Sequence, residues 1–163
     1  MNTSRPNAIQ RFSHRFLMIR PVSAFLSLVL HRLDAVVLKL TRDKYTLTEI
    51  VGLPIIQLTT IGARTGQPRT MPLVSLIDGE RIAIIGSNFG GRHNPGWYYN
   101  LKANPRCTVH FRGRKAEYMA RLTEGDEREK YWQMGVSCYE GYETYRVRAS
   151  HRVIPVVILE PVK

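Results

Sequence analysis

The stretch LPIIQLTTIGARTGQPRTMPLVSLIDGERIAIIGS, residues 53–87, consists of three apolar, β-branched runs separated by two turn signals. The runs occupy 53–60, 70–77 and 81–87. Asp78-Gly79, between the second and third runs, is a strong hairpin signal because both residues tolerate a positive φ angle. The segment 62–68, which contains glycine and proline, has the composition of a turn. The stretch therefore predicts three consecutive strands joined by tight connections.

The chain after residue 87 adds two predicted helices. Asn94 as a cap, followed by a proline in the first turn, predicts a helix that ends near Ala103. Thr123 and Asp126 match a capping box, and the acidic residues that follow favour the positive end of a second helix. We expect this second helix to continue to about Cys138.

Three more apolar runs complete the predicted strands: 107–112 and 115–122, joined as a second hairpin at Gly113, and 153–160. Hairpins imply antiparallel pairing, and six short antiparallel strands usually close into a barrel, which removes their unpaired edges. A doubly wound parallel sheet is disfavoured because strands and helices do not alternate. The predicted fold class is therefore mainly β with helices (α+β), built on one barrel.

The amino-terminal third has a different pattern. We expect an amphipathic helical extension over 1–45 and a barrel domain over 46–163. Apolar residues recur every three or four positions from Val22 to Leu40, which marks one face of a helix. The charge-free run 21–30 is much shorter than the roughly 20 residues that a spanning helix needs. Residues 9–40 therefore predict a helix that lies at a membrane surface, or one that packs on the domain or on a second subunit; the oligomeric state stays open.

The compartment follows from the cysteines and from the start of the chain. Cys107 and Cys138 stand far apart and outside any CxxC motif, so a reducing compartment is the default. No small-residue cleavage site follows the apolar run before His31 and Arg32, which disfavours a secretory signal. We predict a cytoplasmic protein, at the inner face of the cell membrane if the amino-terminal helix binds lipid.

The formal net charge is +11, and the excess lies within residues 1–120, because 121–163 carry equal numbers of basic and acidic side chains. Such asymmetry indicates an anionic partner: nucleic acid, a negatively charged membrane surface or a phosphorylated small molecule. The arginines gather in turns rather than in a continuous stripe, which argues against nucleic acid.

The first candidate site is the segment GARTGQPR, residues 62–69, in which Arg64 and Arg69 flank a glycine-containing turn. Guanidinium groups bind phosphate in a bidentate way, and a tight turn exposes backbone N–H groups beside them. The alternative is an ordinary solvated basic loop. The chain contains no Walker-type G-x-x-x-x-G-K-[ST] motif.

The second candidate is the glycine-rich segment 86–91, where a strand ends and the backbone can approach a planar ligand closely. Trp97 and Tyr98 on the next helix would cover that ligand, unless they fill the core instead. The third candidate is the triplet Tyr139, Tyr142 and Tyr145, whose spacing of three can bring the hydroxyls to one side of a helix. A core or surface stripe is the alternative there.

Other catalytic chemistries find no support in the sequence. No two histidines have metal-ligand spacing, and neither an H-E-x-x-H nor a G-x-S-x-G motif occurs, so neither a metal site nor a serine nucleophile is expected. The chain offers binding groups more clearly than acids, bases or nucleophiles. Such a profile is typical of a protein in which a bound cofactor carries the reaction.

Three segments together, LTTIGARTGQPRTMPL (58–73), NPGWYYNLKANP (94–105) and IPVVILEP (154–161) with the tyrosine triplet before it, resemble the deazaflavin (coenzyme F420)-dependent nitroreductase family, which includes F420-dependent quinone reductases. The resemblance covers the chain from about residue 54 to residue 161. It implies a split β-barrel of the FMN-binding, pyridoxamine-phosphate-oxidase-like class and coenzyme F420 as the cofactor.

The resemblance also implies which residues form the site. The acidic or phosphate-bearing tail of the cofactor would lie at Ala63, Arg64, Thr65, Gly66 and Arg69. The deazaflavin ring would lie along Gly86, Ser87 and Asn88, with Trp97, Tyr98 and Asn100 completing the pocket. The electron acceptor would lie by Tyr139, Tyr142 and Tyr145, with Ser87 nearby. The chain departs from the pattern of the family at three positions. A basic residue is usual at the position of Ala63, a lysine at that of Asn88 and an aromatic residue at that of Val74.

The function that the resemblance implies is that of an oxidoreductase, which transfers a hydride from reduced F420 to a quinone-like or nitro-aromatic acceptor. A quinone is favoured because an interfacial helix would bring the pocket near a bilayer. One alternative is a reductase of the same barrel class that binds FMN. Another is a protein without catalysis that binds F420, anionic lipid or nucleic acid.

Overall fold

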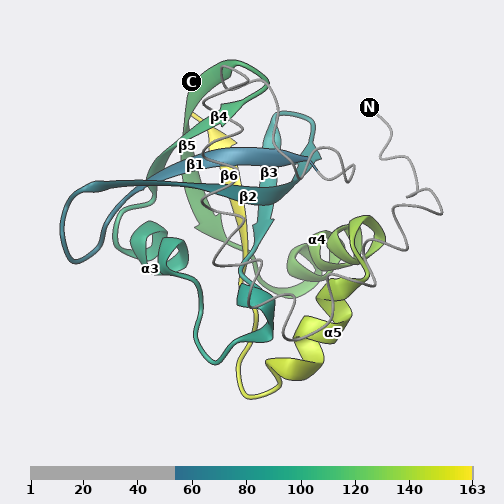
Figure 1. The fold of residues 1–163 in the computed structure, drawn as a ribbon. Helices are drawn as coiled ribbons and strands as arrows, with labels where there is room; N and C mark the ends of the chain where they lie inside the picture. Colours follow the sequence, from purple (N-terminus) through teal and green to yellow (C-terminus); the bar gives the residue numbers. More distant parts are fainter. Residues whose placement is uncertain (1–53, 163) are drawn as a thin grey trace, which may run out of the picture.

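The computed structural model describes residues 54–162, and this part of the chain forms a closed antiparallel barrel of six strands with helices packed around it (Figure 1). The strands are β1 (Ile55–Ile61), β2 (Pro68–Asp78), β3 (Arg81–Ile85), β4 (Arg106–Phe111), β5 (Arg114–Leu122) and β6 (Val156–Pro161). Their order around the barrel is β1-β2-β3-β6-β5-β4, and β1 pairs with both β2 and β4, which closes the sheet. The predicted six-stranded barrel is confirmed.

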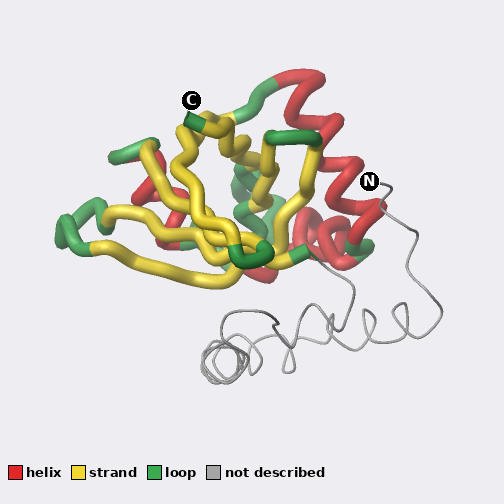
Figure 2. Tube along the Cα trace, turned by 90° about the horizontal axis from the view of Figure 1, so that it is seen from above, coloured by secondary structure: helices red, strands yellow, loops and turns green. Residues whose placement is uncertain are grey.

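The helices are α3 (Gly96–Ala103), α4 (Gly125–Cys138) and α5 (Gly141–Arg148), with a short 3₁₀ helix η2 (Asn88–Gly90). They lie on two sides of the strands, α3 beside β1 and α4 with α5 on the other side (Figures 1 and 2). Helix α5 comes in addition to the two helices expected from the sequence. Its buried stripe is built from tyrosines in an otherwise polar segment, so hydrophobic periodicity did not mark it.

The side-chain caps predicted for the two helices are wrong, because tertiary partners take those side chains. Helix α3 begins after Pro95, and the side-chain oxygen of Asn94 accepts a hydrogen bond from Arg152 Nη1 at 2.6 Å. Helix α4 begins after Glu124, and the buried Thr123 hydroxyl donates to the carbonyl oxygen of Val156 at 2.9 Å. The side chains of these two residues thus join separate parts of the chain instead of capping the beginning of a helix.

Strands β3 and β6 are covered on both faces. Alternate residues of a strand point to opposite faces, so Ile82 and Ile84 pack in the barrel interior, while Ala83 and Ile85 pack against α4 and α5. Strand β6 begins at Val156, three residues later than expected, since the preceding proline has no N–H to offer a ladder. Two apolar cores therefore share these two strands.

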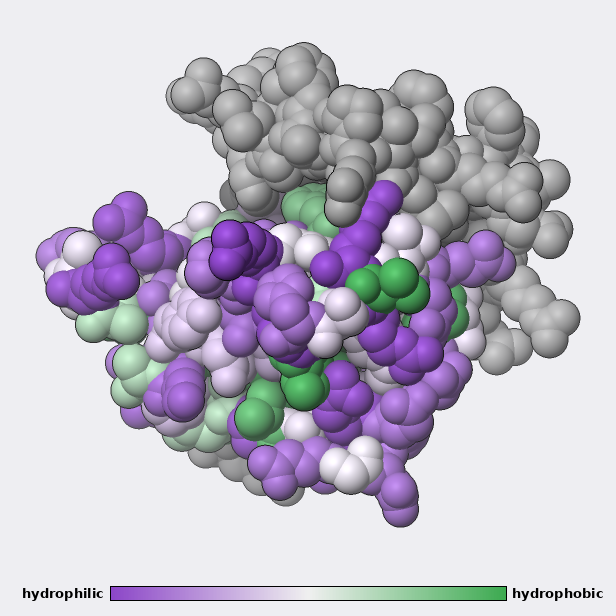
Figure 3. Space-filling model, turned by 90° about the horizontal axis from the view of Figure 1, so that it is seen from below, coloured by the Kyte–Doolittle hydropathy of each residue, from purple (hydrophilic) through white to green (hydrophobic). Residues whose placement is uncertain are grey.

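The first core fills the barrel and the second lies between the sheet and the helices α4 and α5. Trp97 and Leu101 of α3 belong to the first core. In the second core, Trp132 is fully buried and its Nε1–H donates to Glu143 Oε1 at 3.1 Å, which joins α4 to α5. Seen from below, the described surface is mostly hydrophilic and its hydrophobic areas are small and separate (Figure 3). Most of the large apolar side chains among the described residues are buried in the two cores.

The expected amphipathic extension over 1–45, its membrane or packing face within 9–40, and the domain boundary at 45/46 lie outside the described residues. Within residues 54–162, none of the helices has the length and apolar character needed to cross a bilayer.

The barrel core gives a first prediction for stability. Leu58 is fully buried, whereas Leu122 is 48% exposed. We expect Leu58→Ala to lower the free energy of unfolding by about 2–5 kcal/mol, because the substitution removes buried methyl groups and leaves a cavity. Leu122→Ala removes the same atoms from a position that already meets water and should cost well under half as much. Urea unfolding followed by tryptophan fluorescence measures both; equal losses would contradict the assigned barrel interior.

The tyrosines of the second core give a prediction for alkaline pH. Burial is the main cause that raises the pKa of Tyr142 above its ordinary value of 10.0, and the pKa of Tyr139 and Tyr145 rises for the same reason. Above about pH 10 the unfolded chain releases protons that the native tyrosines keep, so the free energy of unfolding falls, by up to about 1.4 kcal/mol per pH unit for each tyrosine. In Tyr142→Phe this decline should be shallower. Urea midpoints between pH 8 and pH 11 test it, and identical slopes in both proteins would contradict it.

Candidate functional site

The turn between β1 and β2 is tightly closed by backbone hydrogen bonds. The N–H of Gly62 donates to Gln67 O at 2.9 Å, and the N–H of Gly66 donates to Gly62 O at 2.8 Å. Gly66 has φ +66°, which favours glycine. A Cβ on Gly62 would lie 2.7 Å from the Thr65 hydroxyl, so this position has no room for a side chain. The turn predicted over 62–68 is confirmed, and its glycines allow its sharp reversal.

Asn100 of α3 holds this turn in place. Its Oδ1 accepts a hydrogen bond from the N–H of Ala63 at 3.0 Å, and its Nδ2 donates to the buried Thr60 hydroxyl at 3.0 Å. Both ends of the amide are therefore used between the helix and the end of β1. Asn100, predicted to complete the ring pocket along residues 86–88, thus lies at the turn between β1 and β2 and determines where that turn lies.

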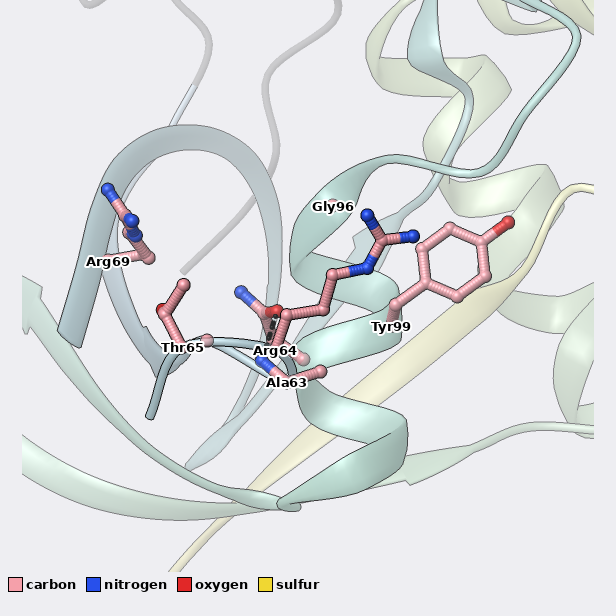
Figure 4. Close-up of a pocket in the computed structure, with 8 residues that line it drawn as sticks. Ala63, Arg64, Thr65, Arg69, Gly96 and Tyr99 are labelled. Carbon is pink, nitrogen blue, oxygen red and sulfur yellow. Dashed lines mark hydrogen bonds between the residues drawn. The ribbon is translucent and has the colours of Figure 1, made fainter. Parts of the chain in front are cut away.

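A pocket of about 430 Å³ opens between this turn and the beginning of α3. It is lined by Gly62, Ala63, Arg64, Thr65, Arg69, Gly96, Tyr99 and Asn100. The Arg64 side chain extends across the pocket past Gly96 toward the Tyr99 ring, while Arg69 lies on the other side of Thr65 (Figure 4). Gly66 belongs to the same turn but is absent from this lining. Four of the five residues predicted for the acidic tail thus meet in one pocket.

The electrostatics of this pocket favour an anion. Two guanidinium groups line it, and none of the described residues that line it is acidic. The amino-terminal end of α3 also faces it at Gly96, and the N–H groups at such an end carry a partial positive charge. The arrangement suits a phosphate or carboxylate group bound in a bidentate way by an arginine.

The aromatic residue of the pocket is one that sequence reasoning passed over. Trp97 is 2% exposed and packs in the barrel core, and Tyr98 packs beside it, so the core alternative holds for Trp97. Tyr99 is the exposed member of the three, and with Gly96 and Asn100 it lines the pocket. Residues at i, i+3 and i+4 share one face of a helix. That spacing, combined with the polar Asn100, was the available signal.

The second candidate segment forms a loop, residues 86–94, at the end of β3. The N–H of Gly86 donates to Pro155 O at 2.8 Å, and the Asn88 side chain donates to His93 O at 2.9 Å within the loop itself. Asn88 and Phe89 both have positive φ angles, 47° and 54°. Such backbone is sparsely populated by residues other than glycine and needs support from its surroundings.

Arg152 provides much of that support, and sequence reasoning did not single it out. Its guanidinium donates to oxygens of the loop: Nε to Gly91 O at 3.0 Å, Nη1 to Gly86 O at 3.4 Å and to Asn94 Oδ1 at 2.6 Å, and Nη2 to Ser87 O at 2.8 Å. No local pattern marks this arginine, since it lies in a polar connection before β6. Its role is visible only once the strands are paired.

The structure brings the tyrosine triplet together in the second core, as the core alternative expected, with Tyr139 at the end of α4 and the other two on α5. The rings of Tyr139, Tyr142 and Tyr145 contact one another with centroids 5.6–6.3 Å apart, and the Tyr139 and Tyr145 hydroxyls are 3.1 Å apart. Phe89 of the loop packs edge-on against Tyr145 with centroids 5.9 Å apart. The cluster belongs to the second core, on another side of the barrel from the arginine pocket, and Phe89 connects it to the loop.

Groups for other chemistry are not gathered in residues 54–162. This part of the chain holds no cluster of three or more His, Cys, Asp or Glu that could bind a metal ion. Burial raises the pKa of the Cys107 thiol to about 12, so this cysteine stays protonated at neutral pH and is a poor nucleophile. The described site is one for binding and orienting.

Comparison with known proteins identifies the family. Residues 34–161 match the family model described as F420H(2)-dependent quinone reductase. An F420H(2)-dependent quinone reductase of Mycobacterium tuberculosis is 36% identical over 109 residues, which cover 65% of this chain and 72% of that protein. The resemblance to F420-dependent reductases is thus confirmed.

Solved structures support both the family and the fold. The structure of an F420-H2 dependent reductase (FDR-A) superposes with a TM-score of 0.61 at 37% identity and covers 66% of this chain and 94% of that chain. A heme-binding protein from Mycobacterium smegmatis, 15% identical with a TM-score of 0.52, covers 68% of this chain and 47% of its own and shares the fold alone. Since the family model spans most of the sequence and close relatives share more than a third of aligned residues, the chain belongs to the F420H(2)-dependent quinone reductase family.

Proposed function

We propose that the protein transfers a hydride from reduced coenzyme F420 to a quinone, and that the pocket around Arg64 and Arg69 holds the acidic tail of the cofactor. The observation that carries this proposal is the arginine-lined pocket at the turn of β1 and β2, in a chain of this family. The relative from Mycobacterium tuberculosis is named for the same reaction class. The FMN alternative loses its support, because the family is defined by F420H(2).

The residues present fit such a cofactor. F420 combines a flat ring with an acidic, phosphate-bearing tail, and the pocket offers two guanidinium groups, the amino-terminal end of α3 and no acidic side chain among its described lining. Arg64 and Arg69 would bind the tail, and Gly86, Ser87 and Asn88 would support the ring at the end of β3. The bound cofactor supplies the hydride. The protein supplies position, since hydride transfer needs the reacting atoms within about 3–3.5 Å of one another.

The tyrosine cluster would bind the acceptor. Burial raises the pKa of Tyr142 and Tyr145, so their hydroxyls keep their protons at neutral pH. A protonated hydroxyl can donate a hydrogen bond to a quinone oxygen as negative charge develops there during reduction. Tyr145 is the member of the cluster that contacts the loop through Phe89, so we assign the donor role to it.

Two finer points stay predictions. Hydride transfer could also reduce a nitro-aromatic acceptor, and an activity assay with both acceptor classes decides whether such an acceptor is used.

Contact with a membrane through residues 9–40 would bring a lipid-soluble quinone to the site. Co-sedimentation with vesicles, compared between the full chain and a chain that lacks residues 1–40, tests this contact.

The arginine pocket generates a prediction for cofactor affinity. Arg64→Ala and Arg69→Ala should each raise the dissociation constant of F420 by about 10- to 100-fold, because a hydrogen bond to a charged group contributes about 1.5–3 kcal/mol. Arg114→Ala, at an exposed arginine of β5 outside the pocket lining, is the matched control and should leave the affinity unchanged. Titration of the fluorescence of F420 measures all three. Unchanged affinity in both pocket variants would overturn the assignment of the pocket.

The acceptor side generates a prediction for turnover. Tyr145→Phe should lower kcat for quinone reduction by about 100-fold while the F420 dissociation constant stays within about twofold, because only a transition-state interaction is lost. Tyr131→Phe is the control, since Tyr131 is equally buried and its hydroxyl donates to Asp78 at 2.8 Å, away from the site. Both variants lose one hydroxyl hydrogen bond, and Tyr131→Phe should lose the more stability because its partner is a carboxylate. A fall in kcat confined to Tyr145→Phe therefore does not come from lost stability. A weaker F420 affinity with normal kcat would move Tyr145 to the cofactor side.

A further inference from the structure

We infer that Arg152 is a positioning residue of this site: its guanidinium holds the loop 86–94 in the one conformation that places Ser87 and Asn88 at the end of β3 and Phe89 against Tyr145. The inference rests on the proposed function, because it concerns how the cofactor side and the acceptor side of that site are held together.

The contacts of Arg152 are distributed over the whole loop. Its four hydrogen bonds reach backbone oxygens of Gly86, Ser87 and Gly91 and the side chain of Asn94, at 2.6–3.4 Å. These acceptors span nine residues of sequence, and the planar fork of a guanidinium can reach them at once. A lysine offers one compact charge with three donors and lacks that fork, so it cannot replace arginine here.

The loop needs such support because of its backbone. Asn88, Phe89 and Gly90 have consecutive positive φ angles of 47°, 54° and 76°. Two of the three are not glycine and lie in a sparsely populated region, which persists only where surrounding contacts over-determine it. Within the loop, the N–H groups of Gly90 and Gly91 each donate to a carbonyl three residues back, and the Asn88 side chain donates to His93 O. The bonds to Arg152 come from outside the loop and add to these.

The segment that contains Arg152 also holds the loop at other points. The ring nitrogen Nε2 of His151 is 3.0 Å from Arg92 O, and the N–H of Gly86 donates to Pro155 O. On the opposite side, Gly90 packs so closely on α5 that a Cβ would lie 2.6 Å from Arg148 Cβ. The loop is thus held between α5 and the connection to β6, with Arg152 as the residue that contacts both ends of it.

The consequence for the reaction follows from the neighbours of the loop. Ser87 and Asn88, assigned to the cofactor ring, and Phe89, in contact with Tyr145, all lie in the segment that Arg152 holds. A displacement of about 1 Å between reacting groups can lower a rate by about 100-fold. Loss of the arginine would therefore affect both cofactor and acceptor although Arg152 need contact neither.

The test compares Arg152→Lys with Arg128→Lys in the full chain. Arg128 is a matched control: its Nη2 donates to Ile154 O at 3.0 Å, in the same connection, while its guanidinium lies over the Trp132 ring of α4 rather than against the loop. Amide hydrogen exchange is measured on the intact protein without cofactor and is read out in the proteolytic peptide that covers residues 86–94. F420 titration and steady-state quinone reduction, with kcat and KM determined separately, are measured in parallel.

For Arg152→Lys we expect the loop amides to exchange at least about tenfold faster, because the loop opens more readily. The F420 dissociation constant should rise and kcat should fall, with kcat lower by up to about 100-fold, because the displaced loop misplaces the reacting groups. Arg128→Lys should lower the unfolding midpoint similarly but leave the other readouts at wild-type values. Unchanged exchange in Arg152→Lys, equal changes in both variants, or a loosened loop with wild-type affinity and kcat would overturn the inference. A wild-type protein that neither binds F420 nor reduces a quinone would instead overturn the proposed function, and the exchange data would still report whether Arg152 holds the loop.

Discussion

Burial of β3 and β6 on both faces is the constraint on which the rest of the structure depends. One face of these strands lines the barrel interior and the other carries α4 and α5. Strands covered on both sides need nearly continuous apolar runs, and these two have them. Since the strands pair antiparallel with Ile85 opposite Val156, the end of β3 and the beginning of β6 leave the sheet together. The loop 86–94 and the connection that contains Arg152 are therefore neighbours.

The candidate site is built from both layers that this constraint creates. Helix α3 belongs to the barrel layer, where Asn100 holds the turn that carries Arg64. The tyrosines belong to the outer layer, against α4 and α5. The loop 86–94 lies between the two, because Phe89 contacts Tyr145 while the loop itself continues β3. In the proposed reaction, the cofactor and the acceptor would meet at this loop.

The structure shows the surroundings of the three positions at which the chain departs from the pattern of the resembled family. Ala63 gives its backbone N–H to Asn100, an interaction that any side chain would allow, and leaves Arg64 and Arg69 as the cations of the pocket. Asn88 closes its own loop through a backbone carbonyl. Val74 packs against the second core, where it takes less room than an aromatic side chain would. The barrel is thus formed without the side chains that are usual at these three positions.

The sequence by itself determined the strands, the turns and the chemistry of the pocket, because these follow from local patterns: apolar runs, Asp78-Gly79 in a hairpin, and arginines beside a glycine turn. Only the tertiary structure decided which residues meet. Trp97 lies in the core and Tyr99 in the pocket, since the direction in which α3 docks decides which of its adjacent aromatic residues faces the barrel. Arg152 has no local signal at all; its contacts exist because two strands far apart in the sequence pair side by side.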